Sequence, residues 1–369
     1  MRLKRLIVPL VAAAVLAACS HGSSGTVTFG AAGPFSQAYG IANKHGIELA
    51  VEQINDSPAW SGGRKLQIAF VDDSGSGVQA SAVASKFVDS TRIVAVVGHV
   101  NSGAMVSAAH VYDGHLAAVA TTATSPALTG ISPWAFRVIT SDSTNGMTIA
   151  QYVNKLGRKR AAVLYENNPY GRGLVDSFRR NYSGQIISID PIDEGADQSF
   201  EPFVSYYKRE HADVVFVAGT DGSGVAFLKE ARRQQLSADL VGGDGWQTVA
   251  TDSAVKPLTE GIYVGAPFSA QDPRPEVKTF VTAYKAKYHE LPDGNAALAY
   301  DATKLLAQAV EKVGPDRKKI RDYLAGLTEQ SAYHGVTGTI RFRPDGDPVG
   351  KGIVMTRAHQ GVLQVESGQ

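Results

Sequence analysis

Apolar and polar positions alternate along this chain in blocks that predict strands and helices in a repeating order. Residues 93–97 are all apolar and have the length of a strand, which is typical of a parallel strand buried on both faces. Residues 47–54 carry apolar side chains at helical spacing, and residues 78–90 also read as a helix. The strand–helix unit recurs as far as residue 120, so we expect a parallel sheet with helices on both faces.

The same order restarts after residue 140 and predicts a second set of elements. Its predicted strands are 161–165, 186–189, 214–217 and 240–241. Three helices follow residue 265, and the longest, at 295–313, carries an apolar stripe. Short predicted strands finish the chain at 338–342, 353–356 and 362–365. We therefore predict an α/β protein with two doubly wound, Rossmann-like lobes.

The chain is expected to cross between the lobes more than once, which makes a hinge of several strands. The crossings are predicted near residues 140–142, 267–268 and 336–338. The first lobe is then 26–140 plus 268–336, and the second lobe is 141–267 plus 337–369.

The first nineteen residues predict export and a lipid anchor. A basic start leads into a short apolar run and then Leu16-Ala17-Ala18-Cys19, which contains the only cysteine. This order resembles a bacterial lipoprotein signal, in which residues 1–18 are removed and Cys19 is lipidated. An ordinary secretory signal with an incidental cysteine is the alternative. Residues 19–25 then form a tether, and the mature protein is extracytoplasmic, anchored on the periplasmic side of a membrane or at the cell surface.

Composition narrows the classes of function. Lys and Arg number 36 and Asp and Glu number 35, so the formal net charge of +1 gives no electrostatic case for a nucleic-acid partner. Hydrophobic residues make up 44% of the chain, which is ordinary for a globular protein with real cores. With Cys19 acylated, no disulfide can form, so burial alone must hold these cores.

Motifs typical of common enzymes are absent from the sequence. It contains no G-x-x-x-x-G-K-[ST] phosphate loop, no H-E-x-x-H and no G-x-S-x-G. The nine histidines are scattered, so we expect neither a metal nor a cofactor. A pairing of His99 with Ser102 is conceivable, but it lacks a third partner. A secreted hydrolase is therefore disfavoured.

Hydroxyl, aromatic and acidic residues gather where the predicted strands end, and open parallel sheets bind ligands at those ends. In the first lobe these residues are Ser102, Thr122 and Thr124. In the second lobe they are Tyr170, Thr220, Asp221 and Asp244. Hydrogen-bond donors on one lobe and acids on the other predict a cleft that holds a zwitterion, with its carboxylate on the first lobe and its ammonium on the second.

Each of these residues also has a plain structural interpretation. Ser102 could cap a helix, and Thr122 and Thr124 could belong to a hydroxyl-rich turn. Tyr170 could pack against a helix start, and Asp221 could form a turn. Their shared position at strand ends is what favours binding.

Several short motifs resemble the type I periplasmic solute-binding proteins of ABC importers, in the branched-chain amino-acid (Leu/Ile/Val) group. The motifs are Gly33-Pro34, 46–55, Asp72-Asp73, Phe136-Arg137 with Ser141-Asp142, 170–173, 242–245, 300–302, and 335–338 with 345–347. Their order and spacing extend from about Thr26 to the C-terminus. The resemblance implies a monomer of two lobes that closes on a ligand, without enzymatic activity.

The resemblance also implies roles for individual residues. Ser102 would hold the ligand α-carboxylate, assisted by Thr122 and Thr124. Asp244 would hold the ligand ammonium, and the rings of Tyr39 and Tyr170 would cover the ligand.

Two positions depart from the leucine binders of that family. Asp244 stands where they carry a glutamate, and Thr220, followed by Asp221, stands where they carry a tyrosine. Asp244 is still an acid at the position that holds the ligand ammonium, so the resemblance still implies an amine or amide ligand. It does not imply leucine, isoleucine or valine.

Two functions follow from the resemblance. The first is a lipid-anchored protein that captures a small amino acid or related amine or amide and delivers it to the permease subunits of an ABC importer. The alternative is a ligand-sensing protein of the same fold that acts on a receptor or regulator. The sequence does not separate the two.

Overall fold

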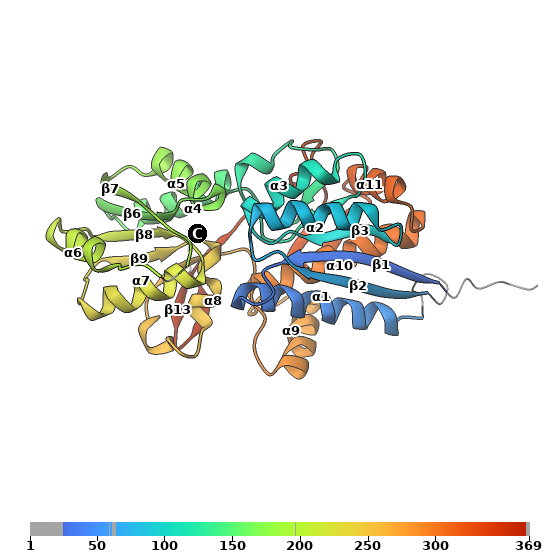
Figure 1. Ribbon diagram of the computed structural model, residues 1–369. Coiled ribbons are helices and arrows are strands. Elements are labelled where there is room, and N and C mark those ends of the chain that lie inside the picture. Colours follow the sequence, from blue (N-terminus) through green and yellow to red (C-terminus); the bar gives the residue numbers. More distant parts are fainter. Residues whose placement is uncertain (1–24, 59, 61–63, 196, 367–369) are drawn as a thin grey trace, which may run out of the picture.

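The computed structural model describes residues 25–58, 60, 64–195 and 197–366. The predicted signal peptide (1–18), Cys19 and all but the last residue of the predicted tether lie outside this part of the chain. Figure 1 shows two lobes side by side, one built around β1, β2 and β3 and the other around β6, β8 and β9. The prediction of a two-lobed α/β fold is confirmed.

The first lobe contains a five-stranded parallel sheet. Its strands, in spatial order, are β2 (Lys65–Asp72), β1 (Thr26–Gly33), β3 (Ile93–Gly98), β4 (Ala118–Ala120) and β5 (Ala135–Arg137). Its helices are α1 (Ala38–Asp56), α2 (Gly77–Asp89), α3 (Ser102–Tyr112), α9 (Pro275–Tyr288), α10 (Gly294–Val313) and α11 (Arg317–Ala325), with a short 3-10 turn at Pro126–Leu128. All of β3 is buried because alternate side chains enter two cores, Val97 with α1 and α10 and Val96 with α2 and α3.

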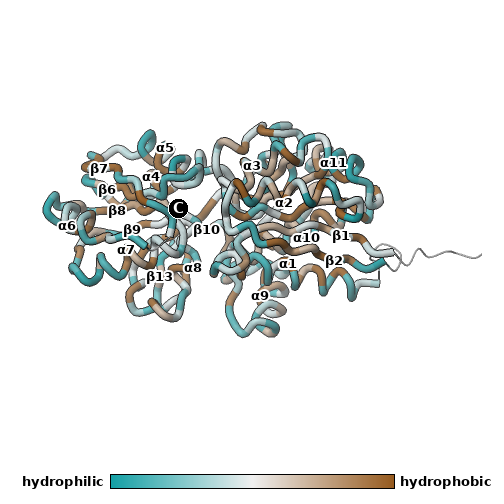
Figure 2. The backbone as a smooth tube through the Cα atoms, in the orientation of Figure 1, coloured by the Kyte–Doolittle hydropathy of each residue, from teal (hydrophilic) through white to brown (hydrophobic). Residues whose placement is uncertain are grey.

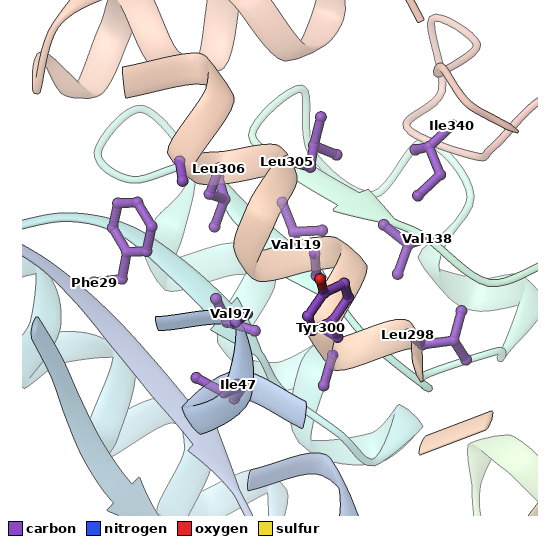
Figure 3. Close-up of a cluster of buried hydrophobic side chains, with 14 of the residues drawn as sticks. Phe29, Ile47, Val97, Val119, Val138, Leu298, Tyr300, Leu305, Leu306 and Ile340 are labelled. Carbon is purple, nitrogen blue, oxygen red and sulfur yellow. The ribbon is translucent and has the colours of Figure 1, made fainter. Parts of the chain in front are cut away.

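The longest helix, α10, forms the centre of the larger core of this lobe. The predicted stripe is buried at Leu298, Ala302, Leu305 and Ala309, and Val313 packs against its end. Figure 3 shows leucines of this helix among side chains from α1 and the sheet, namely Ile47, Phe29, Val97 and Val119. The helix begins at Gly294, where the Asp293 side chain accepts a hydrogen bond from the Ala296 amide and so caps its first turn.

The second lobe contains a seven-stranded mixed sheet. Its strands, in spatial order, are β14 (Val362–Val365), β13 (Val354–His359), β10 (Tyr263–Ala266), β9 (Asp239–Gly242), β8 (Val214–Ala218), β6 (Arg160–Glu166) and β7 (Gln185–Ile192). Its helices are α4 (Asp142–Lys155), α5 (Pro169–Asn181), α6 (Glu201–Arg209), α7 (Asp221–Arg233) and α8 (Gln247–Thr251), with 3-10 turns at Asp244–Trp246 and Lys256–Leu258. Only the pairs made by β13 are antiparallel. The central strand β8 is buried throughout, as its apolar run predicts.

The last crossing between the lobes differs from the prediction at 336–338. The hairpin of β11 (Tyr333–Gly335) and β12 (Gly338–Ile340) leads into Phe342, and Ile340 and Phe342 pack in the core of the first lobe. The buried guanidinium of Arg137 on β5 also pairs with the Asp347 carboxylate at 2.5 Å. The chain therefore stays with the first lobe as far as Asp347 and joins the second sheet only at β13, because an apolar pair and an ion pair hold this segment in place.

Hydrophobic positions concentrate along the strands of both sheets, and hydrophilic positions follow the outer helices (Figure 2). Among the described residues, none of the helices combines the length and apolar character that a membrane crossing needs.

Candidate functional site

A cleft lies between the two lobes, at the carboxyl ends of strands from both sheets. Its cavity volume is about 60 Å³. Its lining is Tyr39, Gly75, Val100, Asn101, Ser102, Gly103, Thr122, Asn168, Tyr170, Glu194, Thr220, Asp244, Gly245 and Asn295. The position agrees with the rule that open α/β sheets bind ligands beyond the strand ends.

Ser102 presents a hydroxyl proton on the first wall of the cleft. The residue is buried at the start of α3, and its Oγ accepts hydrogen bonds from the backbone amides of Thr124 and Ser125, both at 3.1 Å. Both lone pairs of the oxygen are thus engaged, so the hydroxyl is left to act as a donor. The first amides of α3 have no helical acceptor, and the Asn101 side chain does not cap them. This wall can therefore receive an anion.

Asp244 presents a carboxylate on the second wall. It begins the 3-10 turn after β9 and is only 6% exposed. Its Oδ1 accepts a hydrogen bond from the Tyr170 hydroxyl at 3.1 Å, and that hydroxyl oxygen accepts one from the Gly245 amide at 3.0 Å. Burial raises the pKa of Asp244 to about 6. A cation in the cleft would stabilise the ionised form of Asp244 and lower its pKa again.

A second buried acid lies behind Asp244. Asp142 is fully buried at the start of α4, and its amide donates to the Thr124 carbonyl at 2.8 Å. Burial, and then repulsion from Asp244, raise the pKa of Asp142 well above its usual range. The neutral form of Asp142 is therefore favoured, which leaves Asp244 to carry the negative charge of this pair.

The structure brings six of the predicted residues together in the lining. They are Tyr39, Ser102, Thr122, Tyr170, Thr220 and Asp244. Thr124 is instead fully buried behind the wall, where its amide holds the Ser102 oxygen. Asp221 also lies outside the lining; it begins α7, and its Oδ1 accepts a hydrogen bond from the amide of the next residue, Gly222. In this geometry Thr124 supports Ser102, and Asp221 belongs to the start of α7.

Four polar residues of the lining were not predicted from the sequence. Asn101 and Asn168 are the residues just before α3 and α5, and Asn295 lies in the first turn of α10. Glu194 follows β7. The signal that could find them is the same strand-end position that identified Ser102, since all four lie at a helix start or just after a strand.

The two lobes touch beside the cleft. The buried Gln247 side chain donates from Nε2 to the Asp244 carbonyl at 2.9 Å and accepts at Oε1 from the Gly294 amide at 2.9 Å. Gly294 belongs to the first lobe, so this one side chain bridges the lobes next to the acid. A β-carbon built on Gly103 of the first lobe would lie 3.6 Å from Pro169 of the second. The cleft is thus closed on these sides.

His99 does not pair with Ser102. Its Nδ1 lies 2.5 Å from the Asp73 carboxylate and its Nε2 lies 2.9 Å from the Tyr112 hydroxyl, and all three side chains are buried. Both ring nitrogens are therefore engaged away from the serine. This geometry removes the one nucleophile–base pair that the sequence suggested.

The comparisons with known proteins agree with this architecture. A family model described as periplasmic binding protein matches residues 26–361. Leu/Ile/Val-binding protein homolog 1 of Brucella suis is 26% identical, over 88% of this chain and 87% of that protein. Leu/Ile/Val-binding protein BraC3 of Rhizobium johnstonii is 30% identical, over 85% of this chain and 86% of that protein.

Solved structures of the same kind superpose on most of the chain. The branched-chain amino acid transporter substrate-binding protein LivJ from Streptococcus pneumoniae, solved with isoleucine, gives a TM-score of 0.84 at 28% identity, over 92% of this chain and 98% of that one. An ABC transporter substrate-binding protein from Desulfitobacterium hafniense, solved with Leu, gives a TM-score of 0.78 at 29% identity, over 92% and 100%. Proteins of this family bind solutes and are not enzymes. The predicted resemblance is confirmed: the chain belongs to the periplasmic binding protein family.

Proposed function

We propose that this chain is an extracytoplasmic solute-binding protein that captures a small amino acid, or a related amine or amide, and delivers it to an ABC importer. One observation carries the proposal. A hydroxyl donor at an uncapped helix start, Ser102, and a buried carboxylate, Asp244, line the same cleft from opposite lobes. That polarity suits a ligand with an anionic and a cationic end.

The two walls would divide the ligand between them. The α-carboxylate would accept the Ser102 hydroxyl proton and the first amides of α3, where the positive end of the helix dipole lies. The ammonium would donate to Asp244, whose position is fixed by the Tyr170 hydroxyl. The rings of Tyr39 and Tyr170 would cover the ligand, one from each lobe.

Such a ligand would favour the closed arrangement because it contacts both walls at once. We propose that closure moves two units, residues 26–140 with 268–347 and residues 141–267 with 348–366, about three connections. Gln247 would report closure directly, since it links the Asp244 carbonyl to the Gly294 amide across the gap. Transport is supported by the similar proteins from Streptococcus pneumoniae and Desulfitobacterium hafniense, which are described as transporter components.

We also propose that Cys19 carries a lipid anchor. Six residues, Ser20 to Gly25, then separate the membrane attachment from β1. Metabolic labelling of expressing cells with an alkyne fatty acid should mark the full chain and not its Cys19→Ser variant. Equal labelling of the two proteins would contradict the anchor.

The binding proposal is tested by a thermal-shift screen with the twenty amino acids, small amides and aromatic acids, followed by calorimetric titration of each hit. A ligand that binds only the folded state raises the melting temperature. We expect at least one compound with both an amino and a carboxyl or amide group to bind, and Asp244→Asn to abolish its shift while Glu311→Gln, an exposed charge on α10, does not. Binding only of aromatic acids, or undiminished binding by Asp244→Asn, would contradict the proposal.

A further inference from the structure

Beyond Ser102 and Asp244, six residues of the cleft lining carry polar, non-aromatic side chains: Asn101, Thr122, Asn168, Glu194, Thr220 and Asn295. Of the described residues that form it, Val100 alone has an aliphatic side chain, and none is Lys, Arg or His. Two carboxylates, Asp244 and Glu194, face no cation within that lining. An amino-acid zwitterion is neutral and supplies one ammonium to Asp244. The rest of the lining must therefore be matched by the side chain of the ligand.

The carboxylate of Glu166 is buried behind this lining. It accepts hydrogen bonds from donors of two lining residues, Thr220 and Asn168. Glu166 Oε1 accepts from the Thr220 amide at 3.0 Å and from the Thr220 hydroxyl at 2.8 Å. Its Oε2 accepts from Asn168 Nδ2 at 3.2 Å. The same Asn168 nitrogen also donates to Glu194 Oε1 at 2.6 Å. The protons of Thr220 and Asn168 thus point toward carboxylates.

Apart from the Tyr39 hydroxyl, which accepts from Asn101 and keeps its proton to donate, the side-chain groups that remain for a ligand at this end of the cleft are acceptors. The Thr220 hydroxyl donates to Glu166 and so keeps its lone pairs for the cleft. Asn101 donates from Nδ2 to the Tyr39 oxygen at 2.8 Å, and its Oδ1 is buried without a partner. The second oxygen of Glu194 adds a charged acceptor. Burial and the nearby carboxylates of Asp221, Glu166 and Glu194 raise the pKa of Tyr39, as expected in a region of negative potential.

We propose that this acceptor-lined part of the cleft, formed by Asn101, Glu194 and Thr220, selects a ligand side chain that ends in N–H donors: an amide, an ammonium or a guanidinium. The proposal rests on the proposed function and adds the class of amino acid. An aliphatic side chain would leave the half-buried acceptors of Asn101 and Thr220 desolvated and unpaired, which is how polar sites reject apolar analogues.

The test is calorimetric titration of the full mature chain with pairs of similar shape. The pairs are L-asparagine with L-leucine, L-glutamine with L-methionine, and L-lysine with L-norleucine. We expect the donor-terminated member of at least one pair to bind at least about 100-fold more tightly than its apolar partner. The amide pairs and the lysine pair distinguish a neutral donor from a cation, and a preference in either supports the proposal.

Two variants test whether the side chains of Thr220 and Glu194 cause the preference for donor-terminated ligands. Thr220→Val keeps the shape but removes the acceptor, so the asparagine-to-leucine affinity ratio should fall about tenfold, the value of one hydrogen bond at about 1.4 kcal/mol. Glu194→Gln, at an exposed position, should lower the lysine-to-norleucine ratio by up to about fivefold, since an exposed ion pair contributes up to about 1 kcal/mol. Asp197→Asn is the matched control, an exposed acid of the same loop that lies outside the lining, and should change neither ratio.

The proposal is overturned if the apolar member of every pair binds as tightly as its partner, or if neither variant changes its ratio. Tight binding of leucine that Asp244→Asn abolishes would overturn this inference and leave the proposed function standing. If no amino acid or amide binds at all, both fail.

Discussion

Replacing Asp244 with asparagine removes the charge that we propose receives the ligand ammonium, and it keeps the size of the side chain. The wild-type carboxylate is 6% exposed, so water cannot replace the lost partner. Removing one side of a buried ion pair costs about 3–5 kcal/mol, against about 0–1 kcal/mol at an exposed site. At about 1.4 kcal/mol per tenfold, the Kd should rise about 100- to 4,000-fold.

The unliganded protein should respond in the opposite direction. Burial raises the pKa of Asp244, so the charged form costs stability in the empty cleft, and the neutral Asp244→Asn variant should melt at a higher temperature than wild type at pH 7.5. Tyr170→Phe is the graded comparison, because it removes only the hydrogen bond to Asp244 and should weaken binding less. Calorimetry with the tightest ligand of the screen measures affinity, and a thermal melt measures stability. A Kd for Asp244→Asn within threefold of wild type would refute the assignment.

Three further predictions concern the first wall, the pH dependence of binding and the Arg137–Asp347 ion pair. Ser102→Ala should weaken binding and also destabilise the protein by about 1–3 kcal/mol in denaturant unfolding, because the Thr124 and Ser125 amides lose their acceptor; unchanged affinity would contradict the first wall. Since the folded-state pKa of Asp244 is raised to about 6, titrations across pH should show affinity falling as the pH drops through 6, up to about tenfold per unit, whereas a flat profile from pH 7.5 to 5 would contradict its role. In the protein without ligand, the contribution of Asp244 to folding stability has the opposite pH dependence. It is fully present below the pKa of the unfolded state and is lost as the pH rises through 6. Asp347→Asn should destabilise the protein by about 3–5 kcal/mol, since the buried Arg137 guanidinium loses its counter-charge; a loss under 1 kcal/mol would show that the pair is dispensable.

Elements buried on both faces could be predicted from the sequence because the whole run is apolar. The strands β3 and β8 are of this kind, and the helix α10 could be predicted from the helical spacing of its apolar stripe. The rule that ligands bind at strand ends then placed Ser102 and Asp244 at the sheet edges where the cleft lies, since the position of a residue after a strand fixes the end of the sheet at which it lies.

Side-chain direction and short pairings could not be read in the same way. Thr124 and Ser102 follow neighbouring strands, but only the hydrogen bond between them shows that the threonine stands behind the serine. The three-residue strand β5 has no period to detect, and the segment through Phe342 and Asp347 belongs to the first lobe because of contacts that are distant in sequence. The acceptor character of Thr220 likewise depends on the direction of its proton, which the buried Glu166 fixes.

The most direct test of the central claim is a crystal structure with the tightest amino-acid ligand of the screen. The account predicts the α-carboxylate on the Ser102 hydroxyl and the first amides of α3, and the ammonium within hydrogen-bond distance of Asp244, with both lobes in contact with one molecule. A ligand bound with the opposite orientation, or in the depression lined by Phe268 and Arg274 away from these residues, would contradict it.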